Sequence, residues 1–176
     1  YCFDKYHLSP HKSAIWTSAV NPSLFTLPNH QSVSSSFRMV YHGGIIGVNR
    51  GLDNLIKAID LVRDINPHLT LISSLREPLI LRLIDELKLS TVINLIDTLP
   101  QPSLPGYIHE SDIGILPFPS RDSWNTSSPL KLFEYLSCGK PVVVTDIPAH
   151  RNVVGDLPCA FFAKDHSPKE LAKAIR

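Results

Sequence analysis

The chain is 176 residues long and 43% hydrophobic, which suits one α/β domain with a buried core. Its 17 basic and 16 acidic residues leave a formal net charge of +1, so no overall field would attract nucleic acid or anionic lipid. No apolar run approaches the roughly 18 residues of a membrane span, and no charged-then-apolar leader opens the chain, so nothing indicates a membrane-spanning or secreted protein.

Segment 1–36 is predicted to be a connector rather than part of the domain. Its prolines at positions 10, 22 and 28 rule out long helices. Because the chain opens at Tyr1 without an initiator methionine, we expect it to belong to a longer protein. Cys2, His7 and His11 leave a metal site open as an alternative, but no second ligand pair follows at zinc spacing, so we favour a polar lead-in without metal.

From Phe37 onward, strand and helix patterns alternate. Strands are predicted over 37–41, 69–72, 92–96, 113–117, 141–145 and 159–162. Helices are predicted over 51–64, 78–89, 106–110, 129–138 and 168–176. This alternation predicts an α/β fold with a Rossmann-like, doubly wound parallel sheet, because parallel neighbours need helical crossovers. Ligands of such sheets bind at the carboxyl ends of the strands.

The stretch 125–146 predicts an anion-binding loop, a capped helix and a buried strand in succession. Ser128 is expected to cap the helix, with Pro129 at its first position. The free amides there, beside the hydroxyls of Thr126 and Ser127, would receive a phosphate. Glu134, one turn further along, either accepts hydrogen bonds from sugar hydroxyls or is a solvated helix carboxylate.

A second candidate loop follows the first strand. Gly43 and Gly44 allow a ligand to approach the backbone closely, although a Gly-Gly pair alone predicts only a tight turn. Arg50 places a guanidinium at the start of the next helix, where a diphosphate is already favoured.

Three stretches, in the same order, resemble group 1 glycosyltransferases of the two-domain GT-B architecture: Tyr41–Gly51, Tyr107–Phe118 and Ser128–Asp146. The resemblance implies that 37–176 is the C-terminal, donor-binding domain. Segment 1–36 would then be the interdomain connector and the end of a missing acceptor domain.

The resemblance also implies an activity. A sugar would pass, with retention of the anomeric configuration, from a nucleoside-diphosphate sugar such as a UDP-sugar to an acceptor hydroxyl, in the synthesis of cell-surface polysaccharides or glycoconjugates. The acceptor, a glycan, lipid or protein, would be held by the missing N-terminal domain, and no metal or other cofactor is expected. Three cysteines without paired spacing favour a cytoplasmic setting, with the inner face of the membrane open to the intact enzyme.

The resemblance assigns phosphate-binding roles to five residues. Arg50 stands where the family has a lysine that contacts the donor diphosphate. Ser128, Pro129, Leu130 and Lys131 match the turn whose amides meet the phosphates. Because Arg50 already serves the diphosphate, Lys131 is interpreted instead as a surface or loop-bracing cation.

Two more positions match the sites of nucleotide recognition. Glu134 matches the glutamate that binds the ribose, and Leu99 the residue whose backbone recognises the base. Two positions depart from the pattern. Gly44 replaces an arginine at the diphosphate, and Thr126 replaces the glutamate that faces the transferred sugar, so a hydroxyl stands where a carboxylate would stabilise positive charge.

Several alternatives stay open. Phe118 and Trp124 either stack a base or close the core. His42 and His109 are either sugar contacts or structural histidines, and the pair 150–151 is expected in a surface turn. A non-catalytic regulatory module that binds a nucleotide or phosphate through the same fold is the second functional hypothesis.

Overall fold

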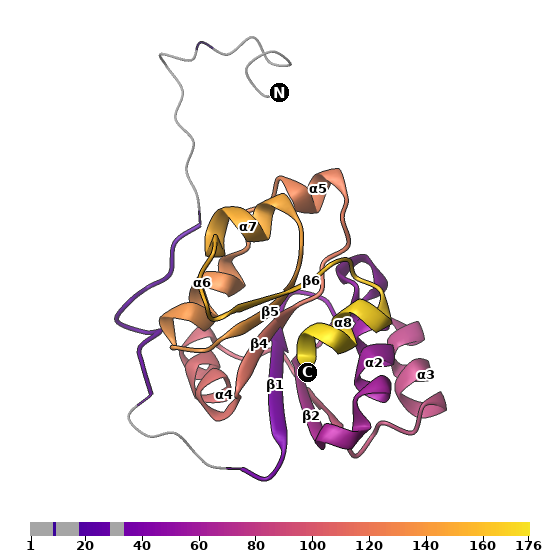
Figure 1. Cartoon of the computed structure of the whole chain (residues 1–176). Helices are drawn as coiled ribbons and strands as arrows, with labels where there is room; N and C mark the ends of the chain where they lie inside the picture. Colours follow the sequence, from indigo (N-terminus) through magenta and orange to yellow (C-terminus); the bar gives the residue numbers. More distant parts are fainter. Residues whose placement is uncertain (1–8, 10–17, 29–33) are drawn as a thin grey trace.

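The computed structural model describes residues 9, 18–28 and 34–176, which contain a parallel six-stranded sheet between two layers of helices (Figure 1). The strand order is β3-β2-β1-β4-β5-β6. The strands are β1 (Phe37–His42), β2 (Pro67–Ile72), β3 (Ile93–Ile96), β4 (Ile113–Leu116), β5 (Val142–Thr145) and β6 (Ala160–Ala163). This order confirms the predicted Rossmann-like fold and places its switch point between β1 and β4.

Amphipathic helices cover both faces of the sheet (Figure 1). The helices α2 (Leu52–Leu61), α3 (Pro78–Glu86) and α8 (Pro168–Ile175) lie on one face. The helices α4 (Leu104–Glu110), α6 (Leu130–Ser137) and α7 (Pro148–Val154) lie on the other. Short helical turns are α5 (Asp122–Asn125), η2 (Val48–Arg50), η3 (Arg63–Ile65) and η4 (Gln101–Ser103). α2 is an example of such an amphipathic helix, because its buried side chains recur at helical spacing and form one apolar face.

The predicted start of α6 is wrong. The helix begins at Leu130, Pro129 occupies the N-cap position, and no side chain caps the helix. The hydroxyl of Ser128 instead accepts a hydrogen bond from the N–H of Ser18 at 2.8 Å, and the Ser18 hydroxyl donates to the Ser128 carbonyl oxygen at 2.9 Å. The hydroxyl that was expected to cap the helix is therefore committed to the preceding segment.

The surface turn predicted at 150–151 is also wrong, because both residues lie in α7. Pro148 opens this helix at a position where no N–H is needed. His150 is fully buried beside β5 and its Nδ1 lies 2.8 Å from the carbonyl oxygen of Thr145. Burial lowers the pKa of His150 to about 4, so this imidazole is neutral and structural.

Part of the predicted connector packs against the domain. Phe25 is buried in the core, and the carbonyl oxygen of Thr26 lies 2.7 Å from Nε2 of His109. His109 therefore has a structural partner, as one of the two interpretations expected. The alternative metal ligands near the amino terminus lie outside the described residues.

Two glycines allow the close packing that brings β1 and β4 elements together. Gly51 has φ +73°, and a Cβ atom there would lie 2.1 Å from the carbonyl oxygen of Pro117, directly after β4. A Cβ atom at Gly114 in β4 would lie 2.3 Å from the ring of Tyr135 in α6. The amino-terminal end of α2 and the second half of α6 are thereby both set against β4.

Candidate functional site

Four of the predicted site residues converge at the carboxyl ends of β1 and β4. Gly43 follows β1 and Arg50 ends η2, whereas Lys131 and Glu134 lie in α6. A Cβ atom at Gly43 would stand 3.0 Å from Cε of Lys131, so the glycine turn and α6 are in contact. Arg50 is close enough for its guanidinium to lower the pKa of the Lys131 amine. The elements expected to hold a diphosphate thus share one edge of the sheet.

Aromatic side chains support the guanidinium of Arg50. Its Cζ lies 4.4 Å from the ring centroid of Trp124 and 5.5 Å from that of Phe118, both within cation–π range. The indole N–H of Trp124 donates to the carbonyl oxygen of Asn49 at 2.9 Å, which fixes the ring against the loop that carries Arg50. Phe118 is buried in the core, whereas Trp124 is half-buried and orients the cation.

Lys131 is half-buried, so the surface half of its interpretation is wrong, whereas its contacts with Gly43 and the ring of Tyr41 agree with the loop-bracing half. Burial, and secondarily the guanidinium of Arg50, lowers the pKa of Lys131 to about 8, while Glu134 opposes the shift. Among the described residues, neither Arg50 nor Lys131 forms a salt bridge. Two partly desolvated cations beside one carboxylate leave an excess of positive charge, which suits an anion of two or more charges.

The first turn of α6 adds backbone donors to these cations. Within the described part of the chain, the N–H groups of Leu130 and Lys131 have no protein acceptor. Such groups at a helix amino terminus favour an anion through both their hydrogen bonds and their partial charge. Pro129 is buried, so this turn offers the backbone N–H groups of Leu130 and Lys131 beside the Lys131 amine.

Glu134 is 3% exposed, which contradicts its alternative as a solvated carboxylate. Its Oε2 lies 3.1 Å from Nε2 of His42, the last residue of β1. The His42 imidazole packs edge-on against Tyr135, with ring centroids 5.4 Å apart, and the His42 backbone N–H donates to the Tyr135 hydroxyl at 3.4 Å. His42 is thus a packed neighbour of Glu134, a pairing that sequence reasoning missed. Its position at the carboxyl end of β1 was the available signal.

The loop that carries Arg50 is fixed to the segment between β2 and α3. Ile46 forms an isolated parallel bridge with Arg76, and the N–H of Val48 donates to Oε2 of Glu77 at 3.1 Å. Arg76 in turn forms an ion pair of 2.6 Å with Asp97, after β3. These contacts hold the loop in place, and none of them involves the Arg50 guanidinium.

The hydroxyls of the 126–128 loop already serve the protein. Thr126 donates to the carbonyl oxygen of Asp122 at 2.8 Å, and Ser127 donates to that of Trp124 at 2.8 Å, so both close α5. Thr126 also lines a hollow of about 490 Å³ together with residues of α5. A lone pair of its hydroxyl oxygen stays available to a ligand there.

Leu99 and Gly44 stand apart from the four converging residues. Leu99 follows β3 and is half-buried against the core, in a loop tied to the β2 end by a bond of 3.0 Å from the N–H of Ser74 to the hydroxyl of Thr98. Gly44 is exposed, and a Cβ atom there would meet nothing within 4 Å. A larger side chain therefore fits at Gly44.

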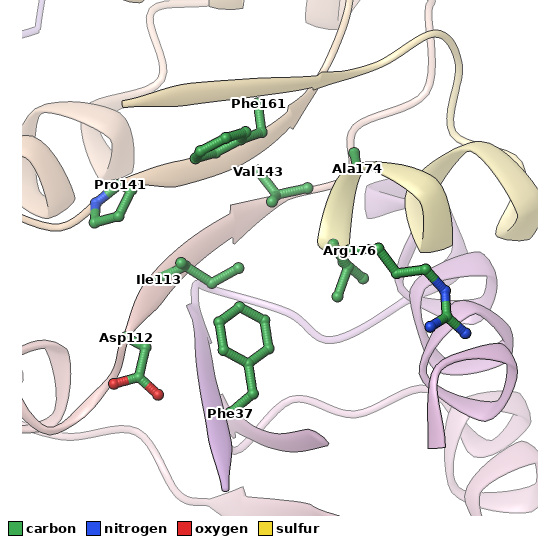
Figure 2. Close-up of a pocket in the computed structure, with 9 residues that line it drawn as sticks. Phe37, Asp112, Ile113, Pro141, Val143, Phe161, Ala174 and Arg176 are labelled. Atoms are coloured by element: carbon green, nitrogen blue, oxygen red, sulfur yellow. The ribbon is translucent and has the colours of Figure 1, made fainter. Parts of the chain in front are cut away.

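A second cavity lies at the opposite end of the sheet and lacks the chemistry of an anion site. It encloses about 330 Å³ and is lined mainly by apolar side chains, including Phe37, Ile113 and Val143 (Figure 2). Its charged neighbours Asp112 and Arg176 already pair with Arg38 and Asp64. Within the described residues, no three side chains of His, Cys, Asp or Glu group as metal ligands, and no helix is long and apolar enough to cross a bilayer.

Fold and site together define a Rossmann-like domain in which two cations and free helix amides gather at the β1–β4 switch point. Residues 36–176 match the family model of glycosyl transferases group 1. Because this match covers most of the chain, the protein belongs to that family.

Individual relatives agree with this membership. The chain is 39% identical over 69 residues to the putative teichuronic acid biosynthesis glycosyltransferase TuaH of Bacillus subtilis (strain 168), a match that covers 34% of the chain and 17% of TuaH. The glycosyltransferase of Rickettsia africae ESF-5 superimposes with a TM-score of 0.79 at 16% identity, over 99% of this chain and 48% of that one. Anabaena Alr3699/HepE, solved with UDP and glucose, superimposes with a TM-score of 0.72 at 16% identity, over 89% of this chain and 44% of that one. The chain thus spans less than half the length of each of these three proteins, and the structural matches show the shared fold.

Proposed function

We propose that this chain is the donor-binding half of a glycosyltransferase that moves a sugar from a nucleoside-diphosphate sugar to an acceptor hydroxyl. Residues 37–176 would form the donor domain and 1–36 the connector to an acceptor domain. The observation that carries the proposal is the convergence of Arg50, Lys131 and the free amides of α6 at the switch point of the sheet. Cations and amides in this arrangement would stabilise the diphosphate leaving group.

Residue roles follow from this geometry together with the family pattern. Arg50, Lys131 and the α6 amides would hold the diphosphate, with Gly43 admitting it close to the backbone. Glu134 would bind the ribose, the backbone of Leu99 the base, and Thr126 would face the transferred sugar beside the hollow at α5. The chain's residues would supply this chemistry without a metal or other cofactor.

The relatives support a class of donor and a class of product for this protein. TuaH is named for teichuronic acid biosynthesis and HepE was solved with UDP and glucose, which supports a UDP-sugar donor and a cell-surface polysaccharide or glycoconjugate product for this protein. The acceptor would be a glycan, lipid or protein on the missing domain, in the cytoplasm or at the inner face of the membrane. Retention of anomeric configuration belongs to the same proposal.

Calorimetric titration with UDP, GDP, ADP and inorganic phosphate tests the proposal. One nucleoside diphosphate should bind more tightly than phosphate, and Arg50→Ala or Glu134→Ala should weaken it by about tenfold or more, as expected for hydrogen bonds to charged groups. Arg82→Ala and Glu86→Ala, both exposed on α3, are the matched controls and should bind normally. Equal binding of phosphate and all nucleotides would favour the regulatory-module hypothesis instead.

A gain-of-function variant sharpens this test. Gly44→Arg places a guanidinium where the family has one, and its Cβ atom has open space. We expect the variant to bind the nucleoside diphosphate more tightly, with a steeper dependence on salt concentration. Unchanged or weaker binding would contradict the placement of the diphosphate beside Gly44.

A further inference from the structure

We infer that Glu77, immediately before α3, is a positioning residue that holds the turn carrying Arg50 in place for a diphosphate. The inference rests on the proposed function and deepens it, because it adds a residue that acts through Arg50 and that the donor-site pattern leaves out. The contact that supports it joins the loop after β2 to η2, the turn that ends at Arg50.

The carboxylate of Glu77 is bound to the backbone of η2. Its Oε2 accepts a hydrogen bond of 3.1 Å from the N–H of Val48, the first residue of that turn. Within the described residues the carboxylate forms no salt bridge. Because an ionised acceptor binds a backbone N–H more strongly than a neutral one does, this contact fixes the start of the turn.

Gly47 leaves the space that the carboxylate fills. A Cβ atom at Gly47 would lie 2.1 Å from Oε1 of Glu77, and the three atoms nearest to it all belong to the Glu77 side chain. The backbone of Gly47 is extended, with φ −160° and ψ 170°, which any residue adopts. The glycine is therefore required by the Glu77 side chain rather than by the backbone conformation.

Backbone hydrogen bonds set the position of Glu77 relative to the turn. The N–H of Glu77 donates to the carbonyl oxygen of Ile46 at 3.0 Å, and the N–H of Ile46 donates to that of Leu75 at 2.8 Å. The turn itself is closed by the N–H of Arg50, which donates to the carbonyl oxygen of Gly47 at 3.1 Å. One turn of backbone thus connects the Glu77 carboxylate to Arg50.

The other side of the turn is held by α5 and the residue before it. Asn49 accepts a hydrogen bond from the indole N–H of Trp124 at 2.9 Å and another from the guanidinium of Arg121 at 2.8 Å. Removing the Glu77 carboxylate would leave this side intact and loosen the side that faces α3. Arg50 would then gain freedom that a bound diphosphate has to remove, which weakens binding.

A double-mutant cycle tests the inference by calorimetric titration of the 176-residue chain with UDP. Glu77→Ala should weaken UDP binding by about three- to tenfold. In an Arg50→Ala background the same substitution should change the affinity by no more than about twofold, because no guanidinium is left to position. Glu77→Gln keeps an oxygen that can accept from the Val48 N–H and should bind UDP within about twofold of wild type.

Gly47→Ala perturbs the same contact independently. Its methyl group would displace the Glu77 carboxylate, so this variant should weaken UDP binding as Glu77→Ala does. In a Glu77→Ala background it should have no further effect, because the carboxylate that it meets is gone. Glu86→Ala, which removes an exposed acidic side chain of α3, is the control and should bind UDP normally.

The possible failures are distinguishable. Normal UDP binding by Glu77→Ala, or losses that multiply in the variant lacking both Glu77 and Arg50, would overturn this inference and leave the proposed function standing. Tighter binding by Glu77→Gln would also overturn it, because the carboxylate would then act by repelling the ligand. A wild-type chain that does not bind UDP would overturn both.

Amide hydrogen exchange in the wild-type chain covers the case in which the variants do not fold. The N–H of Val48 should be protected from exchange, and more strongly protected with UDP bound, because the ligand would fix the turn further. A Val48 amide that exchanges like that of an unstructured peptide, or that does not respond to bound UDP, would overturn the inference.

Discussion

Replacing Lys131 by methionine should stabilise the fold at neutral pH, although it removes a cation from the proposed site. Burial and the neighbouring Arg50 lower the pKa of Lys131 from 10.5 to about 8. At ~1.4 kcal/mol per pKa unit, a shift of this size corresponds to roughly 3 kcal/mol of strain in the folded, protonated state. Because Lys131 is half-buried rather than sealed, solvent screening reduces the expected gain to about 1–3 kcal/mol.

The pH dependence gives this prediction a definite sign. Below about pH 8 both the folded and unfolded wild-type chains carry the proton on Lys131, so the full penalty is present. Between about 8 and 10.5 the folded state has released the proton while the unfolded state keeps it, so this residue's contribution to stability rises with pH. The advantage of Lys131→Met should therefore shrink across this window and vanish above it.

Urea denaturation of both proteins at pH 7 and at pH 10 measures the effect as a difference in the free energy of unfolding. Lys57→Met is the control, because the Lys57 side chain is 44% exposed and pairs only loosely with Asp53, at 3.9 Å. It should change stability by no more than about 0.5 kcal/mol at either pH. If Lys131→Met were no more stable than wild type at pH 7, the lysine would not be under the electrostatic strain that the anion site requires.

Further substitutions probe the architecture and its links to the site. Gly51→Ala should destabilise the fold by about 2 kcal/mol or more in urea denaturation, because φ is +73° and a carbonyl oxygen lies 2.1 Å from the added carbon. Gly114→Ala should cost about 1–3 kcal/mol, since its Cβ atom would lie 2.3 Å from an aromatic ring. Trp124→Leu should weaken UDP binding severalfold in calorimetry by releasing Arg50. Ser128→Ala should lose about 1 kcal/mol of stability and keep its UDP affinity, because its hydroxyl binds the preceding segment.

The opposite result in each of these experiments would contradict a specific part of the structural interpretation. A stable alanine variant at either glycine would mean that α2 or α6 can withdraw from β4. Normal UDP affinity in Trp124→Leu would show that the indole does not orient the guanidinium. A large loss of UDP affinity in Ser128→Ala would show that its hydroxyl contributes to nucleotide binding despite its hydrogen bond to Ser18.

The order of strands and helices could be predicted because apolar residues recur at helical spacing in the helices and form short continuous runs in the strands. β5 is a β-branched stretch that is buried throughout, and α2 repeats apolar residues at helical spacing. Such patterns depend on nearby residues only, so the alternation that implies a doubly wound sheet is visible in the sequence. The same alternation predicted that the site would lie at the carboxyl ends of the strands, which is where the candidate residues converge.

Predictions failed where a partner lies far away along the chain. Two Ser-Pro pairs look alike in sequence, yet Ser167 accepts a hydrogen bond from the N–H of Glu170 and caps α8, while Ser128 binds Ser18 instead. The competing donor is 110 residues away and has no local signature. Similarly, His150 looked like a surface residue because nothing local shows that α7 presses it against β5.

The β1–β4 junction explains why the candidate site and the most demanding packing coincide. Gly51 and Gly114 remove side chains that would hold α2 and α6 away from the strands, and Gly43 admits the Lys131 side chain beside β1. Arg50 is thereby brought near enough to Lys131 to add to the lowering of its pKa that burial causes, and burial limits how much water can screen the two cations. A bound diphosphate would relieve the repulsion between them, so part of the binding free energy would come from strain already present in the unliganded fold. The same contacts therefore account for both the lowered pKa of Lys131 and the expected preference for a multiply charged anion over a neutral ligand.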